Sequence, residues 1–196
     1  MRVLVACEFS GTVRNAFAMR GHNAWSCDLL PTESPGNHFQ CDVKKIVSHG
    51  WDIMIAHPPC TYLCSSGLHW NKRRPERQQQ TEDALNFVQF LMDVKIPRIA
   101  IENPIGCISS RIRKPDQTVQ PWMFGHAESK ATCLWIKGLP KLRPTNVLSL
   151  PESGRWNNQT ASGQNKLPPS ETRWKLRSKT YSGIADAMAE QWGNAK

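Results

Sequence analysis

The sequence predicts an α/β fold built on a doubly wound, mostly parallel sheet. Short β-branched and apolar runs alternate with helical stretches along most of the 196 residues, and this alternation favours parallel strands joined by helical crossovers. The run WDIMIA (51–56) is continuously apolar, as expected for a strand that is covered on both faces. A chain of this length can bury a real core, so we expect 1–196 to form a single domain.

The predicted elements follow one another at short intervals. A strand over 2–7 leads through the turn EFSG into a helix over 12–21, where Gly21 occupies a C-cap position. Further strands are expected at 22–30 (ending near Asp28), 38–43 (ending at Asp42), 51–56, 97–104 and 131–139, and further helices at 73–94 and 184–192. Residues 140–172 are rich in Pro, Ser, Asn and Gly and predict a long loop, a length that is usually functional or disordered.

The charge predicts a polyanionic partner. Lys and Arg number 25 against 16 Asp and Glu, which gives a net charge of +9, and DNA is the expected partner of so basic a domain. A basic surface that serves only solubility is the alternative. Basic residues and the aromatic residues beside them, which could stack on bases, form clusters from which we predict these DNA-binding residues: Trp70, Lys72, Arg73, Arg74, Arg77, Arg111, Arg113, Arg173, Lys175 and Arg177.

Several patterns predict a cytoplasmic protein. No run of 18 apolar residues is present, so we expect no membrane partner. The first apolar run meets Glu8 too soon for a signal peptide. The seven cysteines are odd in number and not closely paired, which indicates free thiols in a reducing compartment.

The ends of the predicted strands read CEFSG, CDLL, CDV, HPPC and ENP. Ligands of an open parallel sheet bind just beyond these carboxyl ends. An acid after the second strand can accept hydrogen bonds from ribose hydroxyls, and an acid after the third can accept one from an adenine amine. Each acid alone could equally cap a helix, and FSGTVR is not a phosphate-binding glycine loop. A nucleoside without pyrophosphate, such as S-adenosylmethionine, therefore fits best.

These motifs, in this order and spacing, resemble those of the DNA cytosine-5 methyltransferases. The stretches QPWMFGHAESKATCLWIKGLPKL and RSKTYSGIADAMAEQW are similar to the small phage- and prophage-encoded members of that family. The resemblance spans nearly the whole chain except roughly residues 145–170. It implies a Rossmann-like fold that uses S-adenosylmethionine, DNA as substrate, and a bacterial cytoplasm as location.

The resemblance also implies roles for individual residues. Cys60 matches the catalytic cysteine, Glu102 the glutamate that holds the target base, and Asn103 the residue that orients the turn. The implied cofactor-binding residues are Glu8, Phe9, Ser10, Gly11, Asp28, Asp42, Pro58 and Gly183.

Four departures from the family pattern stand out. Val13 and Arg14 occupy positions where small residues are common, and Thr61 replaces the usual glutamine. The Gln-x-Arg element has no match, and Lys130 is our first candidate for its arginine, ahead of Arg173 and Arg177. No recognition domain of ordinary size is present, so a short or loosely specified target is expected, with 140–172 in the place of that domain.

Three alternatives remain at this stage. His57, Cys60, Cys64 and His69 have a spacing that could suit zinc, although the prolines disfavour a knuckle and we expect no metal. In that case the two histidines would be loop or groove residues and Cys64 a packed thiol. An amino-directed DNA methyltransferase would place a similar turn after the fourth strand, but His57 and Cys60 fit it badly. A catalytically silent DNA-binding relative would keep the fold and the basic face. We expect a monomer.

Overall fold

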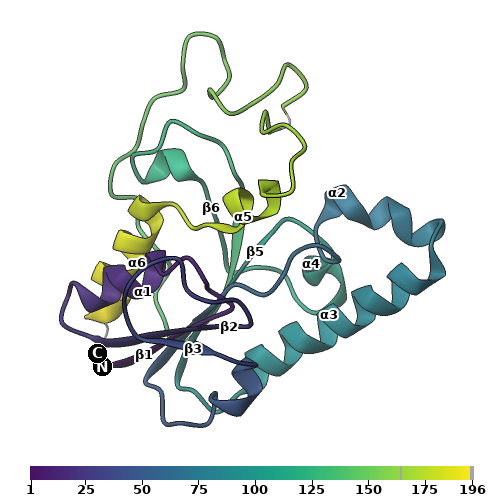
Figure 1. Cartoon of the computed structure of the whole chain (residues 1–196). Coiled ribbons are helices and arrows are strands. Elements are labelled where there is room, and N and C mark those ends of the chain that lie inside the picture. Colours follow the sequence, from purple (N-terminus) through teal and green to yellow (C-terminus); the bar gives the residue numbers. More distant parts are fainter. Residues whose placement is uncertain (164, 195–196) are drawn as a thin grey trace.

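A computed structural model describes residues 1–163 and 165–194. Its centre is a seven-stranded sheet in the order β3-β2-β1-β4-β5-β7-β6. Neighbouring strands from β3 to β5 are parallel, whereas β7 runs antiparallel to both β5 and β6 (Figure 1). The strands are β1 (Arg2–Ala6), β2 (Asn23–Asp28), β3 (His38–Gln40), β4 (Ile53–Ala56), β5 (Arg98–Pro104), β6 (Gln117–Val119) and β7 (Thr132–Lys137).

The central strands are the apolar runs of the sequence. Every residue of β4 is buried, as are four of the five residues of β1. Val5 and Ile55 are directly opposite one another in the ladder between these two strands. Because both faces of these strands are covered, their side chains need not alternate between apolar and polar.

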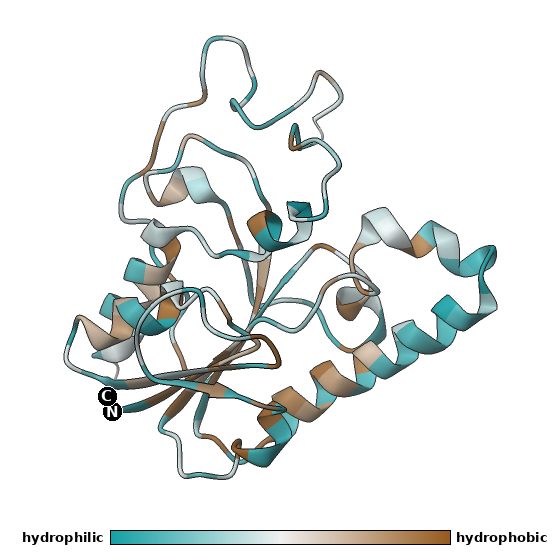
Figure 2. Cartoon of the chain, in the orientation of Figure 1, coloured by the Kyte–Doolittle hydropathy of each residue, from teal (hydrophilic) through white to brown (hydrophobic). Residues whose placement is uncertain are grey.

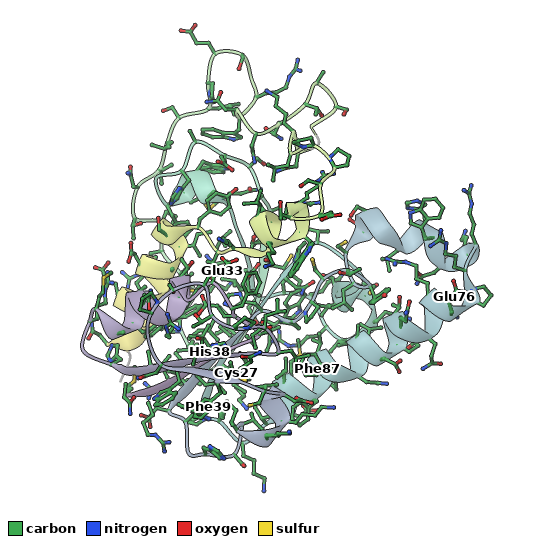
Figure 3. All side chains as sticks on the ribbon, in the orientation of Figure 1. Cys27, Glu33, His38, Phe39, Glu76 and Phe87 are labelled. Atoms are coloured by element: carbon green, nitrogen blue, oxygen red, sulfur yellow. The ribbon has the colours of Figure 1, made fainter. Side chains whose placement is uncertain are left out.

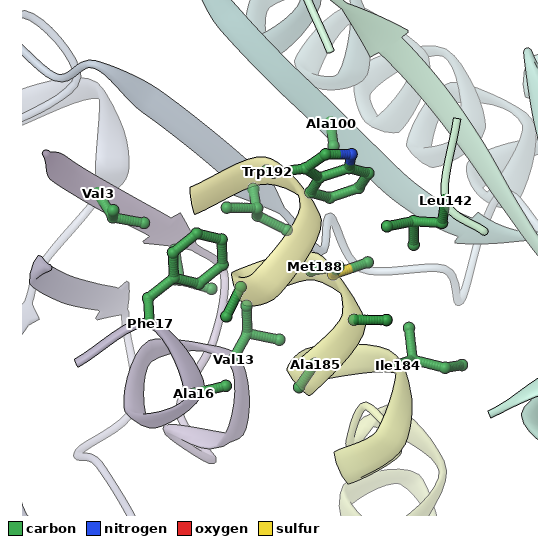
Figure 4. Close-up of a cluster of buried hydrophobic side chains, with 14 of the residues drawn as sticks. Val3, Val13, Ala16, Phe17, Ala100, Leu142, Ile184, Ala185, Met188 and Trp192 are labelled. Carbon is green, nitrogen blue, oxygen red and sulfur yellow. The ribbon is translucent and has the colours of Figure 1, made fainter. Parts of the chain in front are cut away.

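One face of the sheet is covered by α1 (Thr12–Ala18) and α6 (Ser182–Gly193), which pack against each other. Figure 4 shows Phe17 of α1 and Met188 and Trp192 of α6 in the core between these helices and the sheet. The indole Nε1 of Trp192 donates to the Pro140 carbonyl at 2.9 Å, so the last helix also fixes the start of the long loop.

The other face is covered by α3 (Pro75–Asp93), which is the predicted long helix. Its later turns bury Leu85, Val88 and Leu91 against the sheet. Its first turns run beyond the sheet with α2 (Ser65–Leu68) and the 3₁₀ turn η2 (His69–Lys72) (Figure 1). Figure 2 shows the change along α3 from a hydrophilic start to a more hydrophobic end. We call residues 65–77 the arm.

The described residues of 140–172 contain isolated bridges but no helix or strand. The rings of Trp122 and Trp156 stack here with centroids 6.2 Å apart. Asn158 is tied to Ser129 by two hydrogen bonds of 2.8 and 3.0 Å. The loop is therefore attached to the sheet through a few specific contacts.

Element boundaries differ from the sequence predictions at several places. Helix α1 ends at Ala18, three residues before Gly21, and β3 ends at Gln40. Asp42 instead caps the turn η1 (Val43–Lys45) by accepting from the Lys44 amide. Strand β6 was missed because its residues form no apolar run. The other short elements are α4 (Ile108–Arg111), η3 (Pro121–Met123) and α5 (Arg173–Ser178). No helix of the described chain is long and apolar enough to cross a membrane.

Candidate active site

The parallel strands bring the predicted site residues to one edge of the sheet. Phe9, Asp28, Cys60 and Glu102 all lie at or just beyond the carboxyl ends of neighbouring strands. The turns after these strands are joined by backbone bonds, from the Glu8 amide to the Cys27 carbonyl at 3.1 Å and from His57 to Ala6 at 2.9 Å. This edge is the candidate active site.

The turn after β4 carries Cys60 and is fixed from β5. The Asn103 side chain, which is 1 % exposed, donates to the Pro58 carbonyl at 2.7 Å. The amides of Leu63 and Cys64 both donate to the Cys60 carbonyl at 3.0 Å. A Cβ at Gly106 would lie 1.9 Å from the Leu63 carbonyl oxygen, so only glycine allows β5 to approach the turn this closely. We call residues 57–64 the catalytic turn.

Glu102 lies beside this turn and is paired with a residue whose role the sequence analysis missed. His57 Nδ1 is 2.7 Å from Glu102 Oε2, and their side chains are only 9 % and 10 % exposed. Burial alone would raise the pKa of Glu102. The hydrogen bond and charge of His57, together with the charge of Lys130, outweigh it and leave that pKa below its usual value. His57 is therefore more than a loop residue, and nothing in the local sequence indicated this.

Lys130 lies close enough to act on both groups. Its charge lowers the pKa of Glu102 and opposes the rise in that of Cys60. Its ammonium donates to the carbonyls of Arg177 at 2.8 Å and Lys179 at 3.4 Å. Lys130 therefore joins the segment 177–179 to the site. The sequence did not show that Lys130 would lie close enough to Glu102 for its charge to act on that carboxyl group.

The two thiols of the catalytic turn interact. A hydrogen bond from Cys60, then bonds from Ser66 and the Gly67 amide and the charge of Arg177, lower the pKa of Cys64 to about 5 despite partial burial. The same hydrogen bond, followed by burial, raises the pKa of Cys60. The pair therefore carries its first negative charge on Cys64, which the sequence analysis treated only as a metal ligand or a packed thiol.

A cavity of about 220 Å³ opens between β2, the turn after β3 and α3. Asp28 and Asp42 line it together with Pro59 and Phe87, and Figure 3 labels two of its lining residues, Cys27 and Phe87. Burial raises the pKa of Asp28. The size suits a nucleoside fragment rather than a whole drug-sized ligand, and the two carboxylates are suitable acceptors for ribose hydroxyls and an adenine amine. These residues fit the nucleoside part of S-adenosylmethionine.

Glu8 and Gly11 shape the turn after β1. The Glu8 carboxylate accepts from the amides of Val13 at 2.7 Å and Arg14 at 3.1 Å, so it caps α1, and a role in cofactor binding would add to this one. Ser10 donates to the same carboxylate at 3.3 Å. Gly11 has a φ of +74°, and a Cβ there would lie 2.2 Å from Ser34 Oγ.

The departure at Arg14 has a structural reason. This side chain is 1 % exposed, and its guanidinium donates to the carbonyls of Ser34 at 3.0 Å and Pro35 at 2.8 Å. It also donates to the hydroxyl of Ser26 at 3.0 Å. Arg14 therefore holds the loop 31–37 against the turn after β1.

Gly183 has a packing role in this structure. It lies in the first turn of α6, where a Cβ would be 2.0 Å from the Phe124 carbonyl oxygen. Its amide donates to His126 Nε2 at 3.0 Å. The glycine expected beside the cofactor is thus required for contact with the segment around Phe124.

The predicted DNA-binding residues separate into three groups. On the arm, the Trp70 ring has Arg73 and Arg74 within 5.6 and 5.4 Å of its centroid, and Lys72 is exposed beside them. On α5, Lys175 lies 6.0 Å from the Phe9 ring centroid, and Arg177 is exposed. The Nε of Arg173 is buried without a hydrogen-bond partner in the described chain.

The remaining arginines have other roles. Arg77 donates to the Thr61 carbonyl at 2.6 Å and lies over the Tyr62 ring, so it ties α3 to the catalytic turn. The prediction that Arg111 and Arg113 bind DNA stays a prediction, and each of these arginines has an acidic partner. Arg111 pairs with Glu82 at 2.9 Å and Arg113 with Asp116 at 2.8 Å, so neighbouring carboxylates already neutralise both.

The four residues considered for zinc do not converge. His69 lies on the arm with its ring 4.8 Å from that of Trp70, while His57 is bonded to Glu102. Within the described ranges, no three His, Cys, Asp or Glu side chains are arranged to hold a metal ion.

Comparison with known proteins gives a match of fold. No protein-family model matches the chain, and no curated protein matches its sequence. A solved structure described as a candidate DNA modification methyltransferase encoded within a prophage of E. coli matches at 16 % identity with a TM-score of 0.50. The match covers 76 % of this chain and 52 % of that one. The Dnmt2 methyltransferase of S. pombe gives 17 % identity and a TM-score of 0.43, with coverage of 72 % and 50 %.

This chain thus spans about half the length of both matched structures. The protein has a Rossmann-like α/β fold of the kind found in S-adenosylmethionine-dependent methyltransferases, and that fold is similar to a DNA methyltransferase.

Proposed function

We propose that this protein transfers a methyl group from S-adenosylmethionine to carbon 5 of cytosine in DNA. The observation that carries the proposal is the catalytic turn. Cys60 follows two prolines on a turn that Asn103 fixes at 2.7 Å, beside the buried carboxyl group of Glu102. A thiol and a carboxyl group held together at the carboxyl edge of such a sheet are suited to addition chemistry on a pyrimidine ring.

Carbon 5 of cytosine is a weak nucleophile, and the residues of the site can overcome this. Cys60 first passes its proton to the Cys64 thiolate, with which it shares a hydrogen bond. When its sulfur then forms a bond to carbon 6, the electron pair of the ring double bond is displaced and carbon 5 becomes enamine-like. Glu102 holds the exocyclic amine and assists protonation at ring nitrogen 3, which disperses the developing charge. Loss of the carbon 5 proton and cleavage of the carbon–sulfur bond then restore the aromatic ring and the thiolate.

S-adenosylmethionine would supply the methyl group as an electrophile. Asp28 and Asp42 are the residues that would hold its nucleoside part. The arm and α5 carry exposed cations and indole rings on either side of the site. Such surfaces are suited to a nucleic acid backbone and to an unpaired base that has left the helix.

Unmethylated DNA incubated with cofactor labelled in the methyl group, followed by bisulfite sequencing, tests the proposal. The wild-type protein is expected to label DNA and to protect specific cytosines from conversion. Cys60→Ser should abolish transfer while cofactor binding persists, and Glu102→Gln should lose rate by about 10²–10⁴. Label on an amino group would indicate an amino-directed enzyme. Absence of label despite DNA binding would indicate the silent relative.

A further inference from the structure

The pair of His57 and Glu102 is the strongest feature that the proposed chemistry does not yet use. Their 2.7 Å contact is buried, and His57 Nε2 has no hydrogen-bond partner among the residues that the structure describes. A buried ring nitrogen without a partner costs about 1–3 kcal/mol. Such a cost indicates that the imidazole is retained for a purpose other than packing.

Several ionisable groups surround the pair of His57 and Glu102. The ionisable groups nearest to it are the Glu102 carboxylate on β5, Lys130 before β7, Cys60 on the catalytic turn and Cys133 on β7. Lys130 already donates to two backbone carbonyls. Among the residues that the structure describes, only His57 is hydrogen-bonded to the Glu102 side chain, at 2.7 Å.

This arrangement leaves the proposed reaction in need of a proton. Because its pKa is lowered, Glu102 is ionised in the neutral range, and a carboxylate cannot protonate ring nitrogen 3. The nearest donor to that carboxylate is His57 Nδ1.

We propose that His57 is a proton-holding positioning residue that acts through Glu102. As Cys60 adds to carbon 6, the proton on His57 Nδ1 moves to the Glu102 carboxyl group, which passes it to ring nitrogen 3. The imidazole is then neutral and the Glu102 carboxylate is regenerated. The negative charge that the addition of Cys60 places on ring nitrogen 3 is neutralised by the proton. When Cys60 leaves, the proton returns by the same route, so no other donor is consumed.

This inference rests on the proposed function, and the test separates the two. His57→Gln retains a donor to Glu102 but cannot titrate. His49→Gln, at an exposed histidine, is the matched control. Both are compared with wild type for methyl transfer across pH and for adduct formation with 5-fluorocytosine DNA, with cofactor affinity as the measure of folding.

We expect His57→Gln to lose kcat by about 10²–10⁴ with little change in KM, and to lack the fall in rate at alkaline pH that we expect for wild type. A variant as fast as wild type would overturn the inference, and so would a slower one with an unchanged pH profile, because it would reveal a packing role alone. If wild type forms no adduct, the proposed function itself fails and the inference falls with it.

If His57→Gln loses cofactor binding, the variant has not folded correctly, and the role of His57 is then tested in the wild-type protein. With ¹⁵N-labelled histidine, one of the six imidazoles should change its protonation state when 5-fluorocytosine DNA traps the adduct. Six unchanged imidazoles would overturn the inference.

Discussion

Trp174 of α5 lies against Phe9 in the turn after β1, with ring centroids 5.8 Å apart and planes inclined at 59°. The helix α5 therefore covers the turn that we assign to the cofactor, although the two segments are far apart in sequence. Lys130 and the ion pair between Lys179 and Glu33 at 2.6 Å hold the segment after α5 in place.

Trp174→Ala should weaken binding of S-adenosylmethionine roughly twofold to tenfold, because an aromatic pair of this kind contributes about 0.5–1.5 kcal/mol. Isothermal titration calorimetry measures the change. Trp70→Ala, which removes an equally large ring from the arm, is expected to leave the cofactor affinity unaltered. Equal affinities for all three proteins would show that α5 does not close the cofactor site.

The arm and the paired arginines should differ in the salt dependence of DNA binding. Replacing Arg73 and Arg74 with Gln should reduce the slope of log affinity against log salt by about 2, since each phosphate contact contributes about 0.9. Replacing Arg111 and Arg113, which already pair with Glu82 and Asp116, removes the same charge and should barely change the slope. Fluorescence anisotropy across a salt series gives both slopes. The reverse order would place the DNA on the other side of α3.

Arg14 should be important for stability. Arg14→Met leaves the carbonyls of the loop 31–37 without their donor, and we expect a loss on the order of 3 kcal/mol or roughly 6–12 °C in Tm. Arg20→Met removes a partly exposed arginine that pairs with Asp186 at 3.4 Å, and should cost about 0–1 kcal/mol. Thermal unfolding of the two variants measures this difference in Tm, and similar melting temperatures would contradict this account of Arg14.

The ionisation of the thiol pair predicts an order of alkylation. A pKa of about 5 keeps Cys64 mostly as thiolate above that pH and protonates it below, so iodoacetamide labelling of Cys64 should rise between pH 4 and 6. Cys60, whose pKa is raised, should remain unlabelled through neutral pH. Peptide mapping by mass spectrometry after brief labelling measures both. In Cys64→Ser, Cys60 no longer has a neighbouring thiolate whose hydrogen bond raises its pKa. Cys60 should therefore react faster with iodoacetamide than in wild type. Labelling of Cys60 first would reverse the assignment.

Much of the fold was predictable because the central strands contain uninterrupted apolar runs. β4 and β5 are buried on both faces, so apolar residues follow one another in their sequences and indicate buried strands. β6 was missed because its residues, Gln117–Val119, form no apolar run, whereas the equally short β3 is followed by the CDV motif that marked a strand end. α5 was missed because it has only six residues, and their Lys and Arg content predicted a charged surface rather than a helix.

The site was predictable only where chemistry follows a strand end. The strand-end motifs predicted that Cys60, Glu102 and Asn103 would lie at one edge of the sheet, as they do, and their catalytic roles stay predictions. The pairing of His57 with Glu102 joins residues 45 positions apart, and nothing local distinguishes a histidine that will meet a carboxylate. The same holds for Arg77, whose hydrogen bond to Thr61 has no counterpart in any sequence motif.

The loop 140–172 is attached to the protein by the stacked indoles of Trp122 and Trp156 and the bonds between Asn158 and Ser129, while the sheet beneath it is complete. Apart from Leu142 and Trp156, the described residues of this loop are exposed or half-buried. Sequence changes at those other positions cost the core little free energy, so this segment can diverge faster than the catalytic turn. It is the natural place to graft foreign loops when the selectivity of the protein is to be altered by directed evolution, with the two anchors left intact.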